Sequence, residues 1–511
     1  MDCFVLATTS LVFILLYGVA KLSYSIWLKP KWQQRLLNQQ GIRGRAYNLL
    51  VGDMKEFIKQ ITEAWSKPIN LCHQIVPRVD PFTHDNVQKY GKVSFCWTGT
   101  RPRLIIKDPE LMKEVLANKQ GHFQKPPLNP LLLVLCKGIT TLEGEQWSKR
   151  RRMINPAFHL EKLKGLIPIF SVSCRQMIEQ WKEMATSHSS CEIDVWPEFQ
   201  KLTADAISRT AFGSSYEEGK TIFEHQKELI SLTLEAMQSL YIPGFRFVPT
   251  KKNQRRKKLN KEITSMLRNV IRRKQHGMRM GHERADDLLG MLLLSAEENT
   301  SGAERGMANG DVIEECKQFY LAGQETTSSL LTWAIIVLAL HPEWQEKARQ
   351  EILQVCSKEL DFEAIHHLKI VTMILYEVLR LYPPVIALYQ YTNKDTKIKE
   401  ISLPAGVDIT LPILLMNHDP GLWGDDAEEF NPERFSEGVS KASKDTLAFF
   451  AFGWGPRTCI GQNFAMIEAK VALAMILKHF SFKLSPSYSH APYTVMTLQP
   501  QHGAQIIIHQ I

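Results

Sequence analysis

A long run of apolar residues lies at the N-terminus of the chain. Residues Cys3 to Ala20 carry no charge, Lys21 interrupts the run, and Leu22 to Leu28 continue it before a basic cluster begins at Lys29. A helix that crosses a bilayer needs about 20 apolar residues, and the amine of Lys21 can reach the lipid–water boundary from within such a helix. The pattern predicts a membrane anchor over residues 1–28.

A cleaved signal peptide is the alternative interpretation of this run. It would need a basic segment before the apolar core and a small-residue cleavage site after it, but Asp2 precedes the core and no clear site follows. Positive charge comes after the core, at Lys29, Lys31 and Arg35, and such an excess marks the cytosolic side of a membrane helix. We therefore expect the rest of the chain to face the cytosol, with residues 29–60 as a hinge.

Shorter patterns follow the hinge. From Val93 to Ile106, β-branched and aromatic residues alternate with polar ones on both sides of a Gly-Thr-Arg-Pro turn, which predicts a pair of strands. Asp108 and Pro109 then form a helix start signal, and the helical pattern ends near Ala117.

The second half of the chain favours helices. Amphipathic stretches with short breaks fill residues 161–245, and a glycine- and glutamate-rich loop is expected over residues 295–310. The next segment is a long apolar helix through Leu340, which we expect Asp311 to cap.

The charge and the cysteine content limit the binding partners and the cysteine chemistry that the chain is expected to have. The 511 residues can bury a large core, and a formal net charge of +9 fits attraction to anionic lipid or to an acidic protein better than nucleic-acid binding. The 9 cysteines are scattered without a C-x-x-C pair, which indicates a reducing compartment rather than a disulfide framework or a zinc site. The basic stretch 251–274 is interpreted as a solvated helix face that can touch anionic lipid; a nuclear-localisation or nucleic-acid tract is the alternative.

One cysteine lies in a loop with unusual chemistry. The loop Phe452–Gly461 runs into a helical pattern, and Gly455 and Gly461 give its backbone freedom. Arg457 stands two residues before Cys459, and a thiol near a cation and a helix start has a lowered pKa. A thiolate there can be a nucleophile or a metal ligand. A nucleophile would want a nearby base, the loop holds no His or Asn, and a single soft ligand beside aromatic residues suits a haem iron.

The loop pattern F-x-x-G-x-R-x-C-x-G resembles the haem-binding signature of the cytochrome P450 monooxygenases, and every fixed position is present. The resemblance implies that Cys459 is the axial thiolate ligand of the iron of haem b, and that Phe452 and Arg457 belong to the cofactor site. A buried structural cysteine beside a glycine-rich turn is the alternative.

Two further motifs resemble those of the family. Ala322-Gly323-Gln324-Glu325-Thr326-Thr327, in the long apolar helix, resembles [AG]-G-x-[DE]-T, which implies that Thr326 donates protons during oxygen activation and that Glu325 relays them. Trp147 and Arg151, four residues apart on one predicted helix face, resemble W-x-x-x-R, which implies contacts to a haem propionate. The alternatives are a kinked helix with a buried hydroxyl and a solvated basic helix with a lone buried Trp.

A third set of motifs concerns the scaffold of the cysteine loop. Glu377 and Arg380 resemble E-x-x-R, and Arg434 lies in a stretch that resembles P-E-R-F, so the resemblance implies a buried charge network of these three residues. One departure follows Pro383-Pro384: the stretch 385–392 lacks the arginine that often contacts a propionate in this family. Either Gln390 or Tyr391 supplies a neutral hydrogen bond instead, or that propionate relies on Trp147, Arg151 and Arg457. His418 is a weaker candidate because a lone loop His is more often solvated.

The resemblance implies a mainly α fold with a small β region, the cytochrome P450 fold, over residues 61–511, behind an N-terminal transmembrane helix. Short stretches at 41–44, 322–328 and 423–427 are similar to those of a plant group that includes secologanin synthase and triterpenoid and gibberellin oxidases. The implied reaction inserts one oxygen atom of O2 into a C–H bond of a hydrophobic terpenoid, at the endoplasmic reticulum. Electrons would come from NADPH through a separate NADPH–cytochrome P450 reductase.

Two other classes stay open as alternatives: a haem-thiolate isomerase or dehydratase that needs neither O2 nor reductase, and a non-catalytic haem-binding protein. By family position, residues that contact substrate are expected at Leu131–Leu135, Leu240–Phe245, Phe319, Ala322, Ile386–Leu388 and Met496–Leu498. Plain core packing is the alternative for each of them.

Overall fold

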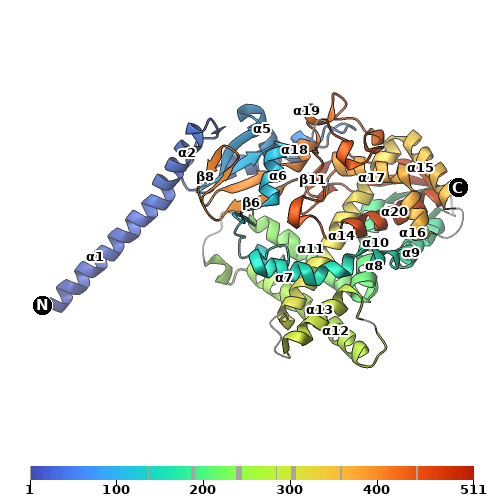
Figure 1. The fold of residues 1–511 in the computed structure, drawn as a ribbon, viewed down its shortest axis with the longest axis horizontal. Helices are drawn as coiled ribbons and strands as arrows, with labels where there is room; N and C mark the ends of the chain where they lie inside the picture. Colours follow the sequence, from blue (N-terminus) through green and yellow to red (C-terminus); the bar gives the residue numbers. More distant parts are fainter. Residues whose placement is uncertain are drawn as a thin grey trace. The chain divides into compact units, whose positions relative to one another are not determined.

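The computed structural model describes residues 2–135, 137–185, 190–237, 244–283, 285–300, 307–356, 360–444 and 447–511. The chain forms two compact units (Figure 1). Unit 1 comprises Met1–Ser66, Asp80–Pro127 and Ala387–Pro412, and unit 2 comprises Lys67–Val79, Leu128–Ile386 and Ile413–Ile511.

Unit 1 is built on a six-stranded sheet of strand order β1-β2-β3-β9-β6-β4. Its strands are β1 Arg43–Gly44, β2 Val93–Thr98, β3 Arg101–Ile106, β4 Phe123–Gln124, β6 Leu388–Thr392 and β9 Asp408–Leu411, and β7 Thr396–Ile398 pairs with β8 Ile401–Leu403. Its helices are α1 Asp2–Ser23, α2 Lys29–Gln39, α3 Met54–Trp65, α5 Pro81–Tyr90 and α6 Pro109–Ala117.

Two local predictions are confirmed in unit 1. Strands β2 and β3 pair antiparallel across the predicted turn, from Val93 opposite Ile106 to Thr98 opposite Arg101. Helix α6 begins where expected because the Asp108 side chain accepts a hydrogen bond from the backbone N–H of Leu111, and it ends at Ala117.

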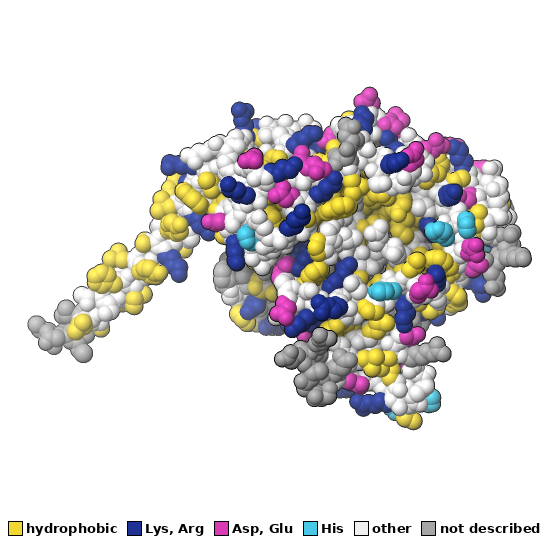
Figure 2. Space-filling view, viewed as in Figure 1, with side chains coloured by type: hydrophobic (Ala, Val, Ile, Leu, Met, Phe, Trp, Pro, Cys, Tyr) yellow, Lys and Arg dark blue, Asp and Glu magenta, His cyan; other side chains and the backbone are white. Residues whose placement is uncertain are grey.

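The apolar N-terminal run is helical, and a π-helical turn, η1 Tyr24–Leu28, joins α1 to α2. By length and composition the helix over Leu6–Gln39 qualifies as a membrane span, with a hydropathy of 1.8 and none of the apolar window buried in the protein. Figure 2 shows hydrophobic side chains along α1 and a group of Lys and Arg side chains near its end. The stretch expected as a hinge, 29–60, contains α2 and the first half of α3.

Unit 2 is mostly helical. Its helices are α4 Val76–Val79, α7 Gly144–Ile154, α8 Leu160–Lys164, α9 Ile167–Ala185, α10 Val195–Phe212, α11 Tyr216–Met237, α12 Lys251–Arg279, α13 Leu288–Thr300, α14 Asn309–Leu340, α15 Pro342–Val355, α16 Phe362–His367, α17 Lys369–Leu381, α18 Ile413–Asn417, α19 Pro420–Trp423 and α20 Gln462–His479. The 3₁₀ turns are η2 Leu132–Val134, η3 Asn155–Phe158, η4 Phe245–Phe247, η5 Pro432–Phe435, η6 Val439–Lys441 and η7 Gly455–Arg457. The strands form two small sheets, β10 Phe480–Leu484 with β13 Gln505–Gln510 and β5 Ser190–Asp194, and β11 Pro492–Thr494 with β12 Leu498–Pro500.

Helix α14 forms the centre of unit 2, where it packs against α10, α17 and α20. Two details differ from the sequence prediction. The capping position is Ala308, because Asp311 lies inside the first turn and pairs with Arg150 of α7. The loop expected over 295–310 is helical up to Thr300, because α13 continues through its polar end; residues 301–306 lie outside the described part.

The basic stretch 251–274 belongs to one long helix, α12. Its inward face carries buried apolar residues such as Leu259 and Ile263, whereas Lys257, Lys261 and Arg268 are exposed. The arrangement agrees with a solvated basic helix face.

Candidate functional site

The loop around Cys459 folds into a tight hairpin before α20. The backbone N–H of Cys459 donates to the carbonyl of Phe452 over 2.8 Å, and Gly453 donates to Phe450 over 2.8 Å. Gly455 adopts a φ of 72°, as its predicted freedom requires, and so does Gly453 with a φ of 76°. Gly461 does not need that freedom, since its φ is −91°.

Cys459 is an exposed residue, in contrast to six others, which are buried or half-buried: Cys72, Cys96, Cys174, Cys191, Cys316 and Cys356. Burial nonetheless raises the pKa of the Cys459 thiol, and the opposing effects of the Gly461 N–H and the Arg151 guanidinium do not overcome this. The predicted low pKa is therefore wrong for the chain by itself, because the loop desolvates the sulfur more strongly than its neighbours stabilise the thiolate. A metal ion at the sulfur would displace the proton outright.

Arg457 is directed to the start of α7. Its guanidinium donates to the carbonyl of Leu142 over 2.7 Å, pairs with Glu143, and lies 4.6 Å above the ring of Trp147. The cation that acts on the sulfur is Arg151, one turn along the same helix from Trp147. Trp147, Arg151 and Arg457 thus gather at one end of the cysteine loop.

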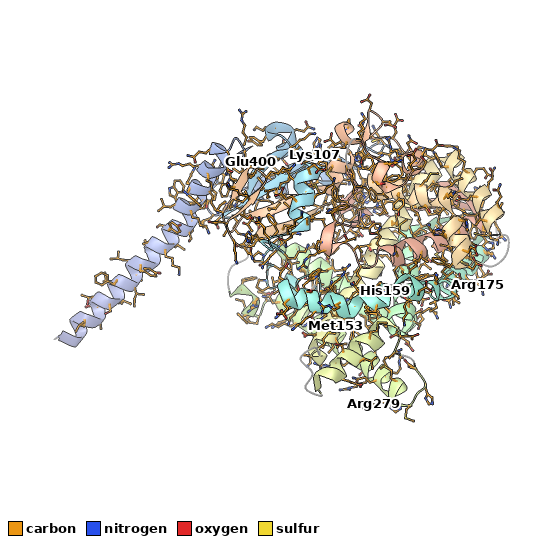
Figure 3. All side chains as sticks on the ribbon, in the orientation of Figure 1. Lys107, Met153, His159, Arg175, Arg279 and Glu400 are labelled. Carbon is orange, nitrogen blue, oxygen red and sulfur yellow. The ribbon has the colours of Figure 1, made fainter. Side chains whose placement is uncertain are left out.

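Aromatic rings join the cysteine loop to α14. The ring of Phe158 lies 4.0 Å from the position that a Cβ would take on Gly461, and it stacks on Phe319 of α14 with centroids 5.6 Å apart. Phe158 comes from the connection between α7 and α8, which Figure 3 marks with Met153 and His159. One turn after Phe319, Ala322 is exposed although the rest of that stretch of α14 is largely buried.

The small residue in the α14 motif has a packing role. A Cβ on Gly323 would lie 2.8 Å from the side chain of Ile207, so glycine permits the close approach of α10. At the same level Thr203 of α10 donates to the carbonyl of Gln324 over 3.0 Å, and Thr326 donates to the carbonyl of Ala322 over 2.8 Å. Both hydroxyls therefore donate to backbone carbonyls of α14, which compete with the hydrogen bonds within the helix.

Glu325 is held in weakly polar surroundings. Thr497 donates to its carboxyl over 3.5 Å. Desolvation raises the pKa of Glu325, while the charge of Lys227 and the Thr497 hydroxyl lower it by less. A desolvated acid of this kind retains a proton to higher pH than a solvated one, which suits a relay.

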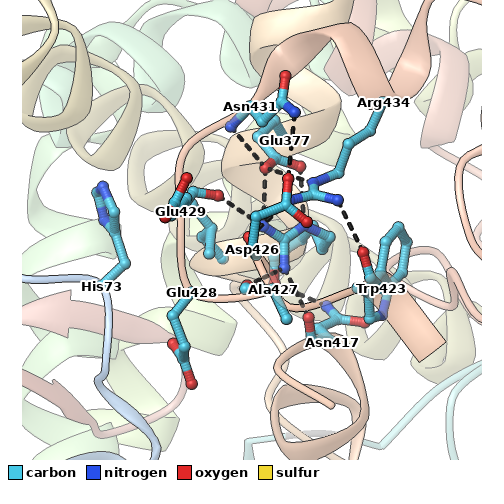
Figure 4. Close-up of polar contacts among 12 residues, drawn as sticks. His73, Glu377, Asn417, Trp423, Asp426, Ala427, Glu428, Glu429, Asn431 and Arg434 are labelled. Atoms are coloured by element: carbon cyan, nitrogen blue, oxygen red, sulfur yellow. Dashed lines mark hydrogen bonds and ion pairs between the residues drawn. The ribbon is translucent and has the colours of Figure 1, made fainter. Parts of the chain in front are cut away.

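The predicted charge network is present and buried (Figure 4). Arg380 donates from two nitrogens to Glu377 over 2.8 and 2.7 Å, and Arg434 pairs with the same carboxylate over 3.4 Å. Arg380 also donates to the carbonyls of Asn417 and Ala427, each over 2.7 Å. The network therefore fixes α17 to the connection that leads toward the cysteine loop.

Aromatic contacts extend the network to Phe449, three residues before the cysteine loop. Phe435, beside Arg434, and Tyr376, beside Glu377, both pack on Phe449 with centroid distances of 5.4 and 5.8 Å. The structure differs from both expectations for His418. The residue is buried, with its ring nitrogens 2.7 Å from Glu428 and 2.9 Å from the carbonyl of Leu381. It is neither solvated nor free to contact a cofactor, because both nitrogens are engaged.

The residues expected to contact substrate have different exposures. Leu131, Leu135, Phe319, Ala387 and Leu498 are buried, whereas Leu133, Phe245 and Ala322 are exposed. Residues 240–243 lie outside the described part of the chain. In the stretch without an arginine, Gln390 is buried, and Arg101 lies 5.9 Å above the ring of Tyr391. A propionate contact by either residue stays a prediction.

The donor set fits a haem. The thiol of Cys459 would offer one soft ligand to the iron, Phe158 packs on α14, and Ala322 is a small exposed residue of α14. Arg151 and Arg457 supply cations suited to carboxylates. The sequence motifs did not indicate Phe158, which contacts the loop from the connection after α7. Thr497 was expected only within a substrate-contact range, because its contact to Glu325 spans 172 residues of the chain.

Comparison with known proteins agrees with this geometry. The family model for cytochrome P450 matches residues 68–507. Cytochrome P450 72A397 from Kalopanax septemlobus is 52% identical over 490 residues, which cover 95% of this chain and 94% of that protein. The 11-oxo-beta-amyrin 30-oxidase of Glycyrrhiza uralensis is 50% identical and secologanin synthase 1 of Catharanthus roseus 48%, each with 95% of this chain and 94% of the relative covered.

Proposed function

This chain belongs to the cytochrome P450 family and is an oxidoreductase with a cysteine-ligated haem, and from that premise we propose that it hydroxylates a terpenoid at the endoplasmic reticulum membrane. The balanced reaction is RH + O2 + NADPH + H⁺ → ROH + H2O + NADP⁺. Bound haem supplies the redox chemistry with O2, which thiolate ligation favours. The chain supplies the ligand, the cofactor cradle, the protons and the shape of the site.

Cys459 is assigned as the residue whose thiolate would bind the haem iron. It stands at the end of a hairpin that the Cys459–Phe452 backbone bond closes, and Arg151 favours the charged form of its thiol. Phe452 shapes the loop at its base. The position of Cys459, at the end of this closed hairpin and near Arg151, is the observation that carries the proposal.

Trp147, Arg151 and Arg457 are assigned to the propionates. They lie together, since Arg457 covers the Trp147 ring and Arg151 acts on the Cys459 thiol. Guanidinium groups bind carboxylates through two parallel hydrogen bonds, so this cluster can hold the acidic edge of a haem.

Thr326 and Glu325 are assigned to proton delivery. The Thr326 hydroxyl lies on α14 next to exposed Ala322, and the raised pKa of Glu325 keeps a proton available beside it. Thr326 would hand a proton to the reacting oxygen and recover one from Glu325.

The substrate class follows from the relatives. Two of them are named for the oxidation of 11-oxo-beta-amyrin and the synthesis of secologanin, at 50% and 48% identity over most of the chain. Together with apolar residues such as Phe319 and Leu131, these names support a triterpenoid or iridoid substrate. A separate NADPH–cytochrome P450 reductase is the proposed electron donor, and the α1 helix is the proposed anchor, with the rest of the chain in the cytosol.

The test begins with the absorption spectrum of the reduced protein under carbon monoxide. Thiolate ligation gives a distinctive red-shifted band, which Cys459→Ser should abolish; an unchanged spectrum and activity in that variant would refute the proposal. Incubation with reductase, NADPH and a panel of triterpenes, iridoids and gibberellins then identifies the substrate class. Turnover of fatty acids alone would reject the terpenoid assignment, and product formed without NADPH would indicate an isomerase or dehydratase.

A further inference from the structure

Thr497 lies where the hairpin of β11 and β12 meets α14. It is 3% exposed, and its hydroxyl donates to the carboxyl of Glu325 over 3.5 Å. Bonds of this length are typical of catalytic groups without their reactants, and they shorten when the reacting complex forms.

The main chain beside Thr497 is attached to α14 by two hydrogen bonds. The carbonyl of Leu498 accepts from the hydroxyl of Ser329 over 2.5 Å and from the indole of Trp333 over 3.0 Å, and its N–H donates to the carbonyl of Pro384 over 3.0 Å. Both donors lie one and two turns beyond Glu325 on the same helix. The position of the Thr497 hydroxyl relative to Glu325 is therefore set by buried bonds rather than by a free loop.

Other groups near Glu325 act on its charge or contact its neighbours in α14. Lys227 of α11 acts on the carboxyl through its charge, and its amine donates to Gln200 over 3.4 Å. The phenol of Tyr493 feels the charge of Glu325 but accepts its own hydrogen bond from Gln499. From α10, Thr203 and Gln200 engage the backbone and amide of Gln324. Thr497 is the residue whose side chain donates a hydrogen bond directly to this carboxyl.

We propose that Thr497 is a positioning residue that holds the Glu325 carboxyl in the orientation from which it passes a proton to Thr326. The inference rests on the proposed function, and it adds that the β11–β12 hairpin takes part in oxygen activation. In each transfer the O–H bond of Thr326 breaks as its proton leaves for the reacting oxygen, an O–H bond of Glu325 breaks and its proton re-forms the O–H bond of Thr326, and Glu325 recovers a proton from solvent. Without Thr497 the carboxyl can turn away, and reducing equivalents are lost without product.

The first test compares Thr497→Val with Thr497→Ser, which keeps the hydroxyl, and with Thr494→Val, which removes a hydroxyl elsewhere on the same hairpin. Thr497→Val should lower the product formed per NADPH by about tenfold, less than loss of the acid itself. The other two variants should stay near wild type. Because Thr497 donation lowers the pKa of Glu325, the alkaline limb of this coupling ratio should move to higher pH in Thr497→Val.

A second measurement does not depend on turnover. In infrared spectra of the purified full-length protein, the carboxyl C=O band that disappears in Glu325→Gln should shift to higher frequency in Thr497→Val and stay in place in Thr497→Ser. In the Glu325→Gln background, Thr497→Val should cause no further loss of coupling, because the two side chains act as one unit.

Three results would overturn the inference. One is an unmoved infrared band, another is additive losses in the double variant, and the third is a Thr497→Val enzyme with a changed KM but normal coupling, which would make Thr497 a substrate contact. A wild-type protein without NADPH-dependent product would instead refute the proposed function, and the infrared result would still report on the contact.

Discussion

Two carboxyl groups on neighbouring helices of unit 2 have opposite surroundings. Glu377 on α17 is fully buried and is matched by Arg380, by Arg434 and by the backbone N–H of Asn431 over 3.0 Å. Glu325 on α14, which packs against α17, has a 3.5 Å contact to Thr497 and the charge of Lys227.

The difference distinguishes a structural carboxylate, Glu377, from a carboxyl group that takes up and releases a proton, Glu325. A buried ion pair with all its partners is costly to disturb, so Glu377 fixes the scaffold. A desolvated carboxyl with few partners keeps its proton more readily, and the cost of its ionised form makes it a proton store. The same residue type therefore serves two roles, and the number of cations around it decides which.

The largest effect is expected from breaking the support. Arg380→Leu should lower the free energy of unfolding by about 3–5 kcal/mol, because it leaves Glu377 buried without its main partner. Denaturation of the purified holoprotein, followed by haem release, measures this. Lys441→Ala is the matched control, since its exposed pair with Glu437 should contribute within about 0.5 kcal/mol. Similar midpoints for the two variants would contradict the distinction.

The next largest effect concerns the packing of α14 against α10 at Gly323, close to Glu325. Gly323→Ala should cost about 1–3 kcal/mol, because the new methyl group would lie 2.8 Å from Ile207 and push α10 away from α14. Gly310→Ala in the same helix has open space within 4 Å and should cause no loss. Ile207→Val in the Gly323→Ala background should recover part of the stability; equal destabilisation by both glycine variants would disprove the explanation.

A smaller effect with an opposite sign is expected from Glu325→Gln. The folded state raises the pKa of Glu325, so the penalty for the folded protein is absent below the unfolded pKa near 4.5 and grows as the pH rises above it. Glu325→Gln removes this penalty and should raise the melting temperature at pH 7 but not at pH 4. Product per NADPH should fall at the same time. A variant less stable than wild type at neutral pH would show that the carboxyl supports the fold as Glu377 does.

The smallest effect is expected from Lys227→Gln. The charge of Lys227 lowers the pKa of Glu325 and lies on an exposed side chain. Its removal should therefore move the alkaline limb of the pH profile of product per NADPH slightly to higher pH. Arg255→Gln, on the next helix and paired with Glu228, is the control that should leave the limb in place. Added salt should reduce the shift; a downward movement would mean that Lys227 acts by another route.

Local patterns were reliable wherever neighbours in sequence decide the structure. The β2–β3 hairpin, the start of α6 and the long helix α14 follow from alternation, a capping Asp and an apolar run. The prediction for Asp311 was wrong because its carboxylate pairs with Arg150, a residue about 160 positions away in the chain. The pKa of Cys459 was predicted in the wrong direction because desolvation depends on every atom around the sulfur, not on the cation two residues before it.

The sequence by itself determined the family, the cysteine of the loop, the Glu325–Thr326 pair and the members of the charge network. Each of them belongs to a short run of residue types with fixed spacing. Only the tertiary structure decided that Arg457 lies over the Trp147 ring while Arg151 acts on the sulfur. It also decided that His418 is buried and hydrogen-bonded, and that Thr497 contacts Glu325. The physical reason is that charge, desolvation and hydrogen bonding act through a few ångströms of space, and folding brings within that range residues that the sequence keeps far apart.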